Sequence, residues 1–261
     1  MGIGEPNVPE AEQTARRFHV SLDYTLLSDD TGLKGNGVGH QFDVNPEYDF
    51  EKFGKVGALI WLESFNAPMA STDVSDTDLL EVDYGPYWAY DIDFLSATVQ
   101  VGWIYETFPR LRGDDASTQE LYVSVSFDDS KWFGVKEPVL NPFVAYFQDI
   151  DNSPGGRLAF GISHTFSLAE MGMKDTPFLK DVDISPVFLM EVDNGQLGHH
   201  WRAEDYQVGI EAGYDLTESL KLSPKFGRIM LTTFVYYRDA LMDGQGDDRF
   251  YGGLTFSYMW Q

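Results

Sequence analysis

The sequence predicts an all-β protein, a single antiparallel up-and-down transmembrane β-barrel of about twelve strands. Apolar and polar residues alternate with period two along most of the chain, as expected of strands with two unlike faces. Most alternating segments run for about 12 residues, whereas globular strands average about 5–6 and tilted membrane strands need about 9–11. Aromatic residues make up 15% of the chain, and many lie near the ends of these segments.

The alternation is clearest in residues 94–107, where Val99, Val101 and Trp103 alternate with small or polar residues. Glycines dilute the second predicted segment, and the eleventh is long enough to bend near Gly227. The predicted strands are 18–27, 36–44, 54–66, 80–91, 94–107, 117–128, 139–150, 156–168, 182–193, 204–215, 220–238 and 249–260.

Prolines mark where several strands begin. Pro142, Pro186 and Pro224 each follow an Asn or Ser near the start of a predicted strand, where a missing N–H removes few ladder hydrogen bonds. These are the seventh, ninth and eleventh predicted strands, and alternate strands of an antiparallel barrel begin at the same end. The three prolines are therefore predicted to lie on one rim. Pro86 falls in the middle of a strand, and we interpret it as the site of a β-bulge.

Composition excludes several classes of protein. The chain has 261 residues, with 18 Lys and Arg against 42 Asp and Glu, so its formal net charge is -24. Nucleic acid is therefore not expected as a partner, because phosphate binding needs clustered basic residues. The absence of cysteine excludes disulfides and thiol catalysis. Residues 1–17 are predicted to be a flexible polar segment without a signal peptide, as in a mature chain, and 18–261 to be the barrel domain.

Alternation alone leaves open whether the apolar face points inward, as in a soluble sandwich, or toward lipid. Tyr and Trp near the strand ends, for example Trp103 and Tyr105, favour the membrane arrangement, because aromatic girdles lie at those depths. An even strand number places both ends of the barrel domain on one side. The chain also closes on an alternating aromatic segment, from Phe250 to Trp260.

Three features of residues 18–261 carry a resemblance to a known family: the regular spacing of the strands, the Asn-Pro or Ser-Pro pairs where strands start, and the aromatic last strand. In these features the chain resembles the twelve-strand Gram-negative outer-membrane barrels, such as the MipA/OmpV-like and nucleoside-channel-like groups. The resemblance implies a bacterial outer-membrane location, with the lipid bilayer, lipopolysaccharide and the outer-membrane assembly machinery as partners. By the same analogy the termini are periplasmic, and a pore is expected. No family site residue carries over to this chain.

Carboxylates dominate the polar strand faces, which would line the lumen. Such a lumen favours cations, so the sequence predicts a passive, cation-preferring pore for small polar or cationic solutes. A sealed structural, adhesin or assembly-partner barrel and a membrane-embedded lipid hydrolase are the alternatives. The predicted lining residues are Asp23, Glu63, Glu81, Asp83, Asp91, Glu106, Glu120, Glu191, Asp205 and Glu211, with Arg157, Arg228 and Arg238.

No catalytic residue, metal site or cofactor is predicted. Ser163 and His164 are adjacent in one strand and so face opposite sides. His19 lies on the polar face, where it could meet a lumen carboxylate. The neighbouring His199 and His200 fall in a predicted loop, and two such histidines rarely hold a metal alone. Asp149, Asp151 and Asn152 resemble a calcium loop but lack its distal Glu.

Overall fold

The computed structural model describes residues 17–29, 37–66, 78–109, 111, 113–135, 138–152, 155–195, 201–241 and 248–260. These form a closed antiparallel barrel of twelve strands with one additional short strand, β9. The strands are β1 (Phe18–Asp29), β2 (Gly37–Asp49), β3 (Lys55–Asn66), β4 (Asp78–Ile92), β5 (Ala97–Thr107), β6 (Ser117–Phe127), β7 (Phe143–Asp149), β8 (Gly156–Ser163), β9 (Phe166–Ser167), β10 (Val182–Asn194), β11 (Arg202–Asp215), β12 (Arg228–Ala240) and β13 (Arg249–Trp260).

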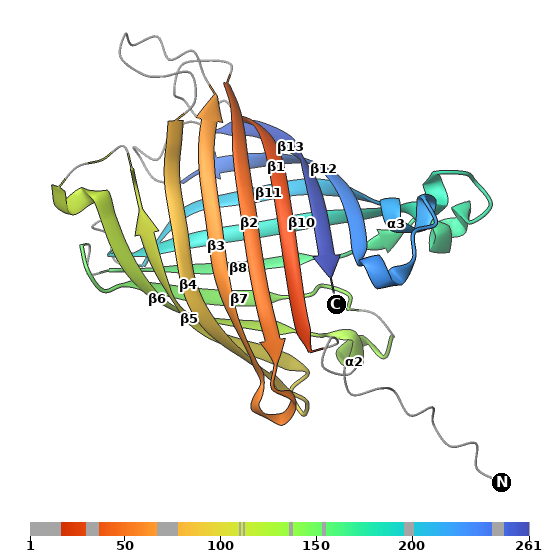
Figure 1. Ribbon diagram of the computed structural model, residues 1–261, viewed down its shortest axis with the longest axis horizontal. Coiled ribbons are helices and arrows are strands. Elements are labelled where there is room, and N and C mark those ends of the chain that lie inside the picture. The colour runs from red at the N-terminus through yellow and green to blue at the C-terminus, as the bar shows by residue number, and fades with distance from the viewer. Residues whose placement is uncertain are drawn as a thin grey trace.

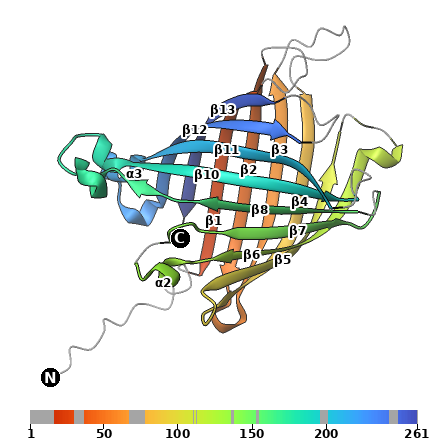
Figure 2. The ribbon, with the colours of Figure 1, turned by 180° about the vertical axis from the view of Figure 1, so that it is seen from behind.

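The barrel closes because the last strand pairs with the first. β13 runs antiparallel to β1, with Thr25 opposite Thr255 and their hydroxyls 2.8 Å apart. Each other long strand pairs with its neighbours in the chain, and β9 extends the edge of β10 beyond the end of β8. Strands β1 to β4 form one wall, and β7, β8, β10 and β11 cross behind them on the other (Figures 1 and 2).

The two ends of the barrel differ. We call the end where β1 begins and β13 ends the termini-bearing rim, and the other end the opposite rim (Figure 1). None of the described helices has the length and apolar character needed to cross a membrane. The termini-bearing rim carries η1 (Glu51–Phe53), α2 (Ser130–Phe133), η3 (Ala169–Met173), η4 (Leu179–Asp181), α3 (Leu216–Ser219) and η5 (Pro224–Phe226), and the opposite rim carries η2 (Gly113–Ala116).

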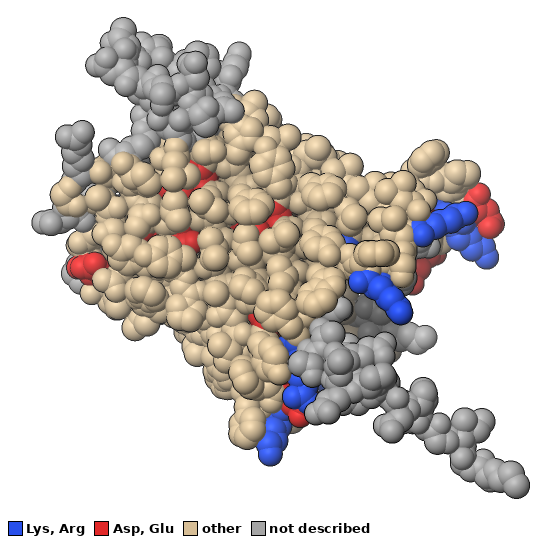
Figure 3. Space-filling view, viewed as in Figure 1, with Lys and Arg blue, Asp and Glu red and all other residues tan. Residues whose placement is uncertain are grey.

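The apolar face of the strands points outward. Ile210 and Val235, which are direct partners across β11 and β12, are each 58% exposed. Their neighbours along the strands, such as Glu211 and Tyr236, line an interior cavity. The visible wall in Figure 3 is mostly uncharged, with a few Asp and Glu atoms showing between other residues, and the lysine and arginine atoms in view gather toward the termini-bearing rim. The faces are therefore inverted relative to a soluble sandwich.

Four predicted strands differ from those observed by four residues or more, all at the termini-bearing rim. β2 continues to Asp49, whereas the predicted strand ends at residue 44. β7 begins at Phe143 rather than residue 139, because residues 138–142 form a turn that hydrogen-bonds to Asp129. The segment 156–168 is divided between β8 and β9 by His164 and Thr165. β12 begins at residue 228, since 216–226 contain the short helices α3 and η5.

The prolines are arranged largely as predicted. Pro142 directly precedes β7, Pro186 is the fifth residue of β10, and Pro224 begins η5 before β12, so all three lie toward the termini-bearing rim. Pro86 is not at a bulge, because the β4–β5 register is the same on both sides of it. Instead, Gly85 and Pro86 are two positions of β4 that have no ladder partner in β5. Proline has no N–H to donate, and a side chain at Gly85 would collide with the Trp103 carbonyl.

Most of the predicted flexible segment 1–17 lies outside the described residues, as do His199 and His200.

Candidate functional site

The candidate site consists of two cavities in the interior of the barrel. The first, the acidic cavity, has a volume of about 540 Å³ and is lined by Asp43, Leu59, Trp61, Glu81, Asp83, Glu106, Glu120, Arg157 and Glu204. The second, the aromatic cavity, has a volume of about 580 Å³ and is lined by Thr25, Leu27, Gln41, Glu63, Val187, Leu189, Gln207, Glu211, Thr232, Phe234, Tyr236, Arg238, Arg249, Tyr251, Thr255 and Ser257.

Carboxylates oppose one another across neighbouring strands of the inner wall. Like charges in directly opposed positions destabilise a sheet, so a fold gains nothing from them structurally. Their repetition on one face is therefore not explained by the stability of the sheet. The opposed pairs are Asp23 and Asp43, Glu63 and Glu81, Asp83 and Glu106, Glu120 and Asp149, and Glu191 and Asp205.

Two arginines offset part of this charge. Arg157 Nη1 lies 3.2 Å from Glu191 Oε1, and its guanidinium also stacks over the Phe147 ring at 4.8 Å. Arg238 Nε donates to Asp205 Oδ2 at 2.7 Å, and Asp205 is fully buried. Six carboxyl groups line the acidic cavity with Arg157 as the single basic residue of its lining, so acidic groups far outnumber basic ones there.

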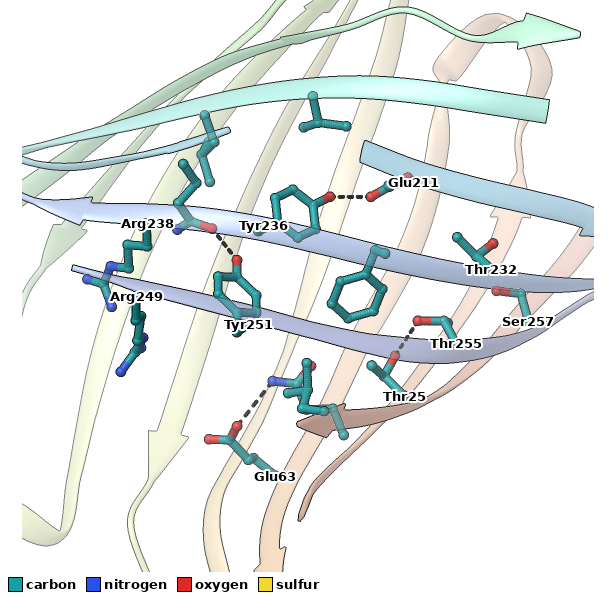
Figure 4. Close-up of a pocket in the computed structure, with 16 residues that line it drawn as sticks. Thr25, Glu63, Glu211, Thr232, Tyr236, Arg238, Arg249, Tyr251, Thr255 and Ser257 are labelled. Atoms are coloured by element: carbon teal, nitrogen blue, oxygen red, sulfur yellow. Dashed lines mark hydrogen bonds between the residues drawn. The ribbon is translucent and has the colours of Figure 1, made fainter. Parts of the chain in front are cut away.

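The aromatic cavity is bounded by tyrosines that are held by hydrogen bonds (Figure 4). The Tyr236 hydroxyl donates to Glu211, and the Tyr251 hydroxyl donates to Gln207. The two rings stack with their centroids 5.4 Å apart. Gln41 donates to Glu63 across the cavity wall at 3.1 Å. The contacts of Tyr236 and Tyr251 fix their rings against the wall of β11 to β13.

Glycines allow these aromatic rings to lie flat. Gly209 is directly opposite Tyr236, and a Cβ atom at Gly209 would overlap the tyrosine ring. Gly57 has the same relation to Tyr87 on β3 and β4. Each tyrosine covers the bare backbone of its neighbour instead of projecting across the lumen.

The structure brings most predicted lining residues into the lumen. Glu81, Asp83, Glu106, Glu120 and Arg157 line the acidic cavity, and Glu63, Glu211 and Arg238 line the aromatic cavity. Glu191 pairs with Arg157 and Asp205 pairs with Arg238, and Asp23 lies opposite Asp43.

Two predicted lining residues lie near the termini-bearing rim instead. Arg228 is half exposed and binds Asp215 at 2.7 Å, and Asp91 accepts a hydrogen bond from Thr98 at 2.6 Å. Neither lines the two cavities.

Several lumen residues were missed in the sequence. Asp43 and Arg249 share the period-two parity of their strands' polar faces, so alternation alone could have identified them. Glu204 could not be identified in that way. By alternation, the Glu204 side chain would point outward, as that of Tyr206 does. Glu204 points inward because the pairing register shifts opposite Glu191 and Val192.

The histidines do not assemble a catalytic group among the described residues. The His164 ring packs edge-on against Phe166 with centroids 4.1 Å apart, and its buried Nδ1 has no hydrogen-bond partner there. His19 lines a separate cavity of about 250 Å³ near Glu47 and Lys55. In the loop 149–152, Asp149 accepts from Thr118 and from the Asp151 backbone N–H, so its oxygens are engaged within the protein.

Comparison with known proteins supports the fold. No protein-family model matches the sequence, and no curated protein is a significant match. An outer-membrane channel from Pseudomonas putida F1 is similar in structure, with a TM-score of 0.52 and 9% identity over 93% of this chain and 95% of that one. The NanC porin (TM-score 0.49, 12% identity, 93% and 99% covered) and outer membrane phospholipase A from Escherichia coli (0.45, 14%, 92% and 89%) are also similar.

The last two similarities are too weak to support an inference, and at these identities the first shows the fold alone. The fold is that of bacterial outer-membrane barrels. The finer resemblance to the MipA/OmpV-like or nucleoside-channel-like groups stays a prediction.

Proposed function

We propose that the protein is an outer-membrane channel for the passive passage of small polar or cationic solutes, with selectivity set by the negative lumen. The main support for this proposal is the set of opposed carboxylate pairs on the inner wall. Fixed negative charge in a narrow, low-dielectric passage lowers the energy of a cation there and raises that of an anion.

The outer surface supports the proposed location. A wall on which Ile210 and Val235 are largely exposed would be costly in water but is stabilised by lipid. Trp88, which donates to the Phe53 carbonyl at 2.8 Å, and Tyr90 stack at the termini-bearing end of β4, where an aromatic girdle would meet the lipid headgroups. Lipopolysaccharide and the assembly machinery are the partners this location implies.

Neutralising lumen carboxylates tests the proposal. In planar bilayers under a KCl gradient, the double variant Asp83→Asn/Glu106→Gln is expected to lower the K⁺/Cl⁻ permeability ratio, because it removes an opposed pair from the acidic cavity. Asp175→Asn is the matched control, since Asp175 is an exposed residue outside the lumen. Equal permeability ratios in the double variant and wild type would contradict the proposal.

A sealed barrel is the second candidate function. Asp205 and Asp193 are 0% and 1% exposed, so part of the interior is closed to solvent. A sealed scaffold or adhesin would show no conductance in the same bilayers, while its heat-modifiable gel migration would still report a folded barrel.

A further inference from the structure

The strands β10 and β11 contain a β-bulge that concentrates carboxylates at one point of the lumen wall. Asp205 pairs with Glu191, but the next pair joins Val192 to Ala203, so Glu204 is the extra residue. A bulge re-aims the side chains beside it. Here it turns two consecutive residues, Glu204 and Asp205, toward the interior, where strict alternation would allow only one.

The bulge brings three carboxylates together. One oxygen from each of Glu191, Glu204 and Asp205 lies within 4.8 Å of the other two. Calcium binds oxygens at about 2.4 Å, so two ligands on opposite sides of one ion are about 4.8 Å apart. The three oxygens therefore fit around a single ion with little movement.

The neighbouring arginines leave this cluster incompletely compensated. Arg157 binds Glu191 and Arg238 binds Asp205, whereas Glu204 has no ion-pair partner within 4.0 Å among the described residues. Asp205 is fully buried and uses Oδ2 for Arg238. Its Oδ1 is also buried and has no hydrogen-bond partner in the described part of the chain.

A buried carboxylate oxygen without a partner is costly, and a cation would remove that cost. We propose that Glu191, Glu204 and Asp205 form a binding site for a hard divalent cation of the calcium type. All three ligands are carboxylates, which suit calcium or magnesium better than softer metals, and water in the acidic cavity can complete the coordination. Calcium is favoured because it tolerates irregular geometry.

The site lies close to the opposite rim. Glu191 is three residues before the end of β10, and Glu204 is two residues after the start of β11. A cation held there would neutralise the repulsion between Glu191 and Asp205 and would link the two strands at the mouth of the lumen. This site goes beyond the proposed conduction and does not depend on it.

The test uses the full chain refolded into detergent without lipopolysaccharide, which itself binds divalent cations. Titration calorimetry with Ca²⁺ is expected to show one saturable site in the wild type. Glu204→Gln is expected to weaken Ca²⁺ binding by about tenfold or more, since it removes a direct ligand. Glu106→Gln, a lumen carboxylate outside the three, is the matched control and should weaken Ca²⁺ binding far less than Glu204→Gln does, because it removes charge from the same cavity but no direct ligand.

Heat-modifiable gel migration confirms that each variant is folded, and Glu191→Gln replaces Glu204→Gln if the latter does not fold. No Ca²⁺ binding by the wild type at millimolar concentration would overturn the site. So would equal losses in the Glu204 and Glu106 variants, which would indicate diffuse attraction to the acidic lumen. A cation-selective current without Ca²⁺ binding overturns only this site, and Ca²⁺ binding without conductance overturns only the proposed channel.

Discussion

Single glycines decide how much of the lumen the inward tyrosines occupy. The Tyr236 ring lies against the bare backbone of Gly209 and donates its hydroxyl to Glu211, one position further along the same inner face. In this position the ring covers backbone and orients a carboxylate. A larger residue at position 209 would force the ring away from the wall and break that hydrogen bond.

Gly209→Ala is expected to destabilise the barrel by about 1–3 kcal/mol, the usual cost of overpacking, and to lower its conductance. Gly213→Ala is the control on the same inner face of β11, because its Cβ would meet Met230 Cε at an ordinary 3.4 Å. Urea unfolding in detergent and single-channel recording measure the two effects. A Gly209 variant no less stable than the Gly213 variant would show that the ring is not confined.

At the scale of elements, the turn between β6 and β7 depends on one buried carboxylate. Asp129 is fully buried and accepts the Val139 and Leu140 N–H groups at 2.7 and 2.8 Å. Burial opposes its charged form, but these backbone donors outweigh it, so the pKa of Asp129 lies below its ordinary value of 3.8. The contribution of Asp129 to stability is therefore present above pH 3.8 and is lost as the pH falls from there through the lowered pKa.

Asp129→Asn is expected to loosen this turn, since an amide has one acceptor oxygen for two backbone donors. Hydrogen exchange of the peptide that covers residues 130–142, corrected for intrinsic rates, should rise at neutral pH. The same rise should occur in the wild type as the pH falls below 3.8. Asp128→Asn is the control, because Asp128 accepts hydrogen bonds from Ser130, including its backbone N–H at 2.9 Å, whereas the Val139 and Leu140 N–H groups bind Asp129. Equal exchange in the two variants would refute the role of Asp129.

The sequence predicts those strands whose position is set by the alternation of inward and outward residues. In β5, β6, β11 and β13 the predicted bounds agree with the structure within a few residues. The prediction fails at 220–227, where Leu220, Leu222 and Phe226 imitate strand alternation although they lie exposed in a turn at the rim. It also fails for the bulge at Glu204, because a bulge depends on the pairing of two strands and leaves no local signal.

At the scale of the whole molecule, the net charge of -24 is unevenly distributed. Carboxylates line the lumen, whereas the lysines among the described residues all lie in the turns of the termini-bearing rim or beside them. These lysines are Lys52, Lys55, Lys131, Lys174, Lys180, Lys221 and Lys225. A cation moving through the lumen would thus meet a carboxylate-lined interior without lysines and then a rim where lysines lie beside acidic residues such as Asp93, Asp175 and Asp181. This asymmetry is expected to make the conductance depend on the sign of the voltage.

Current–voltage curves of the wild type in symmetrical KCl measure this asymmetry. Raising the KCl concentration should reduce the rectification, because salt screens the exposed lysines at the rim more than the buried carboxylates. Rectification that is unchanged between low and high salt would argue against a role for the lysines at the termini-bearing rim.

In the proposed channel, the inward carboxylates set the selectivity of an open lumen. The reversal potential of the wild-type channel in a planar bilayer under a tenfold KCl gradient tests this proposal most directly. The predicted reversal potential has the sign of the K⁺ equilibrium potential, which is about 59 mV in magnitude for one charge and a tenfold gradient. A reversal potential with the sign of the Cl⁻ equilibrium potential, or the absence of any current from folded protein, would contradict the proposed cation-selective channel.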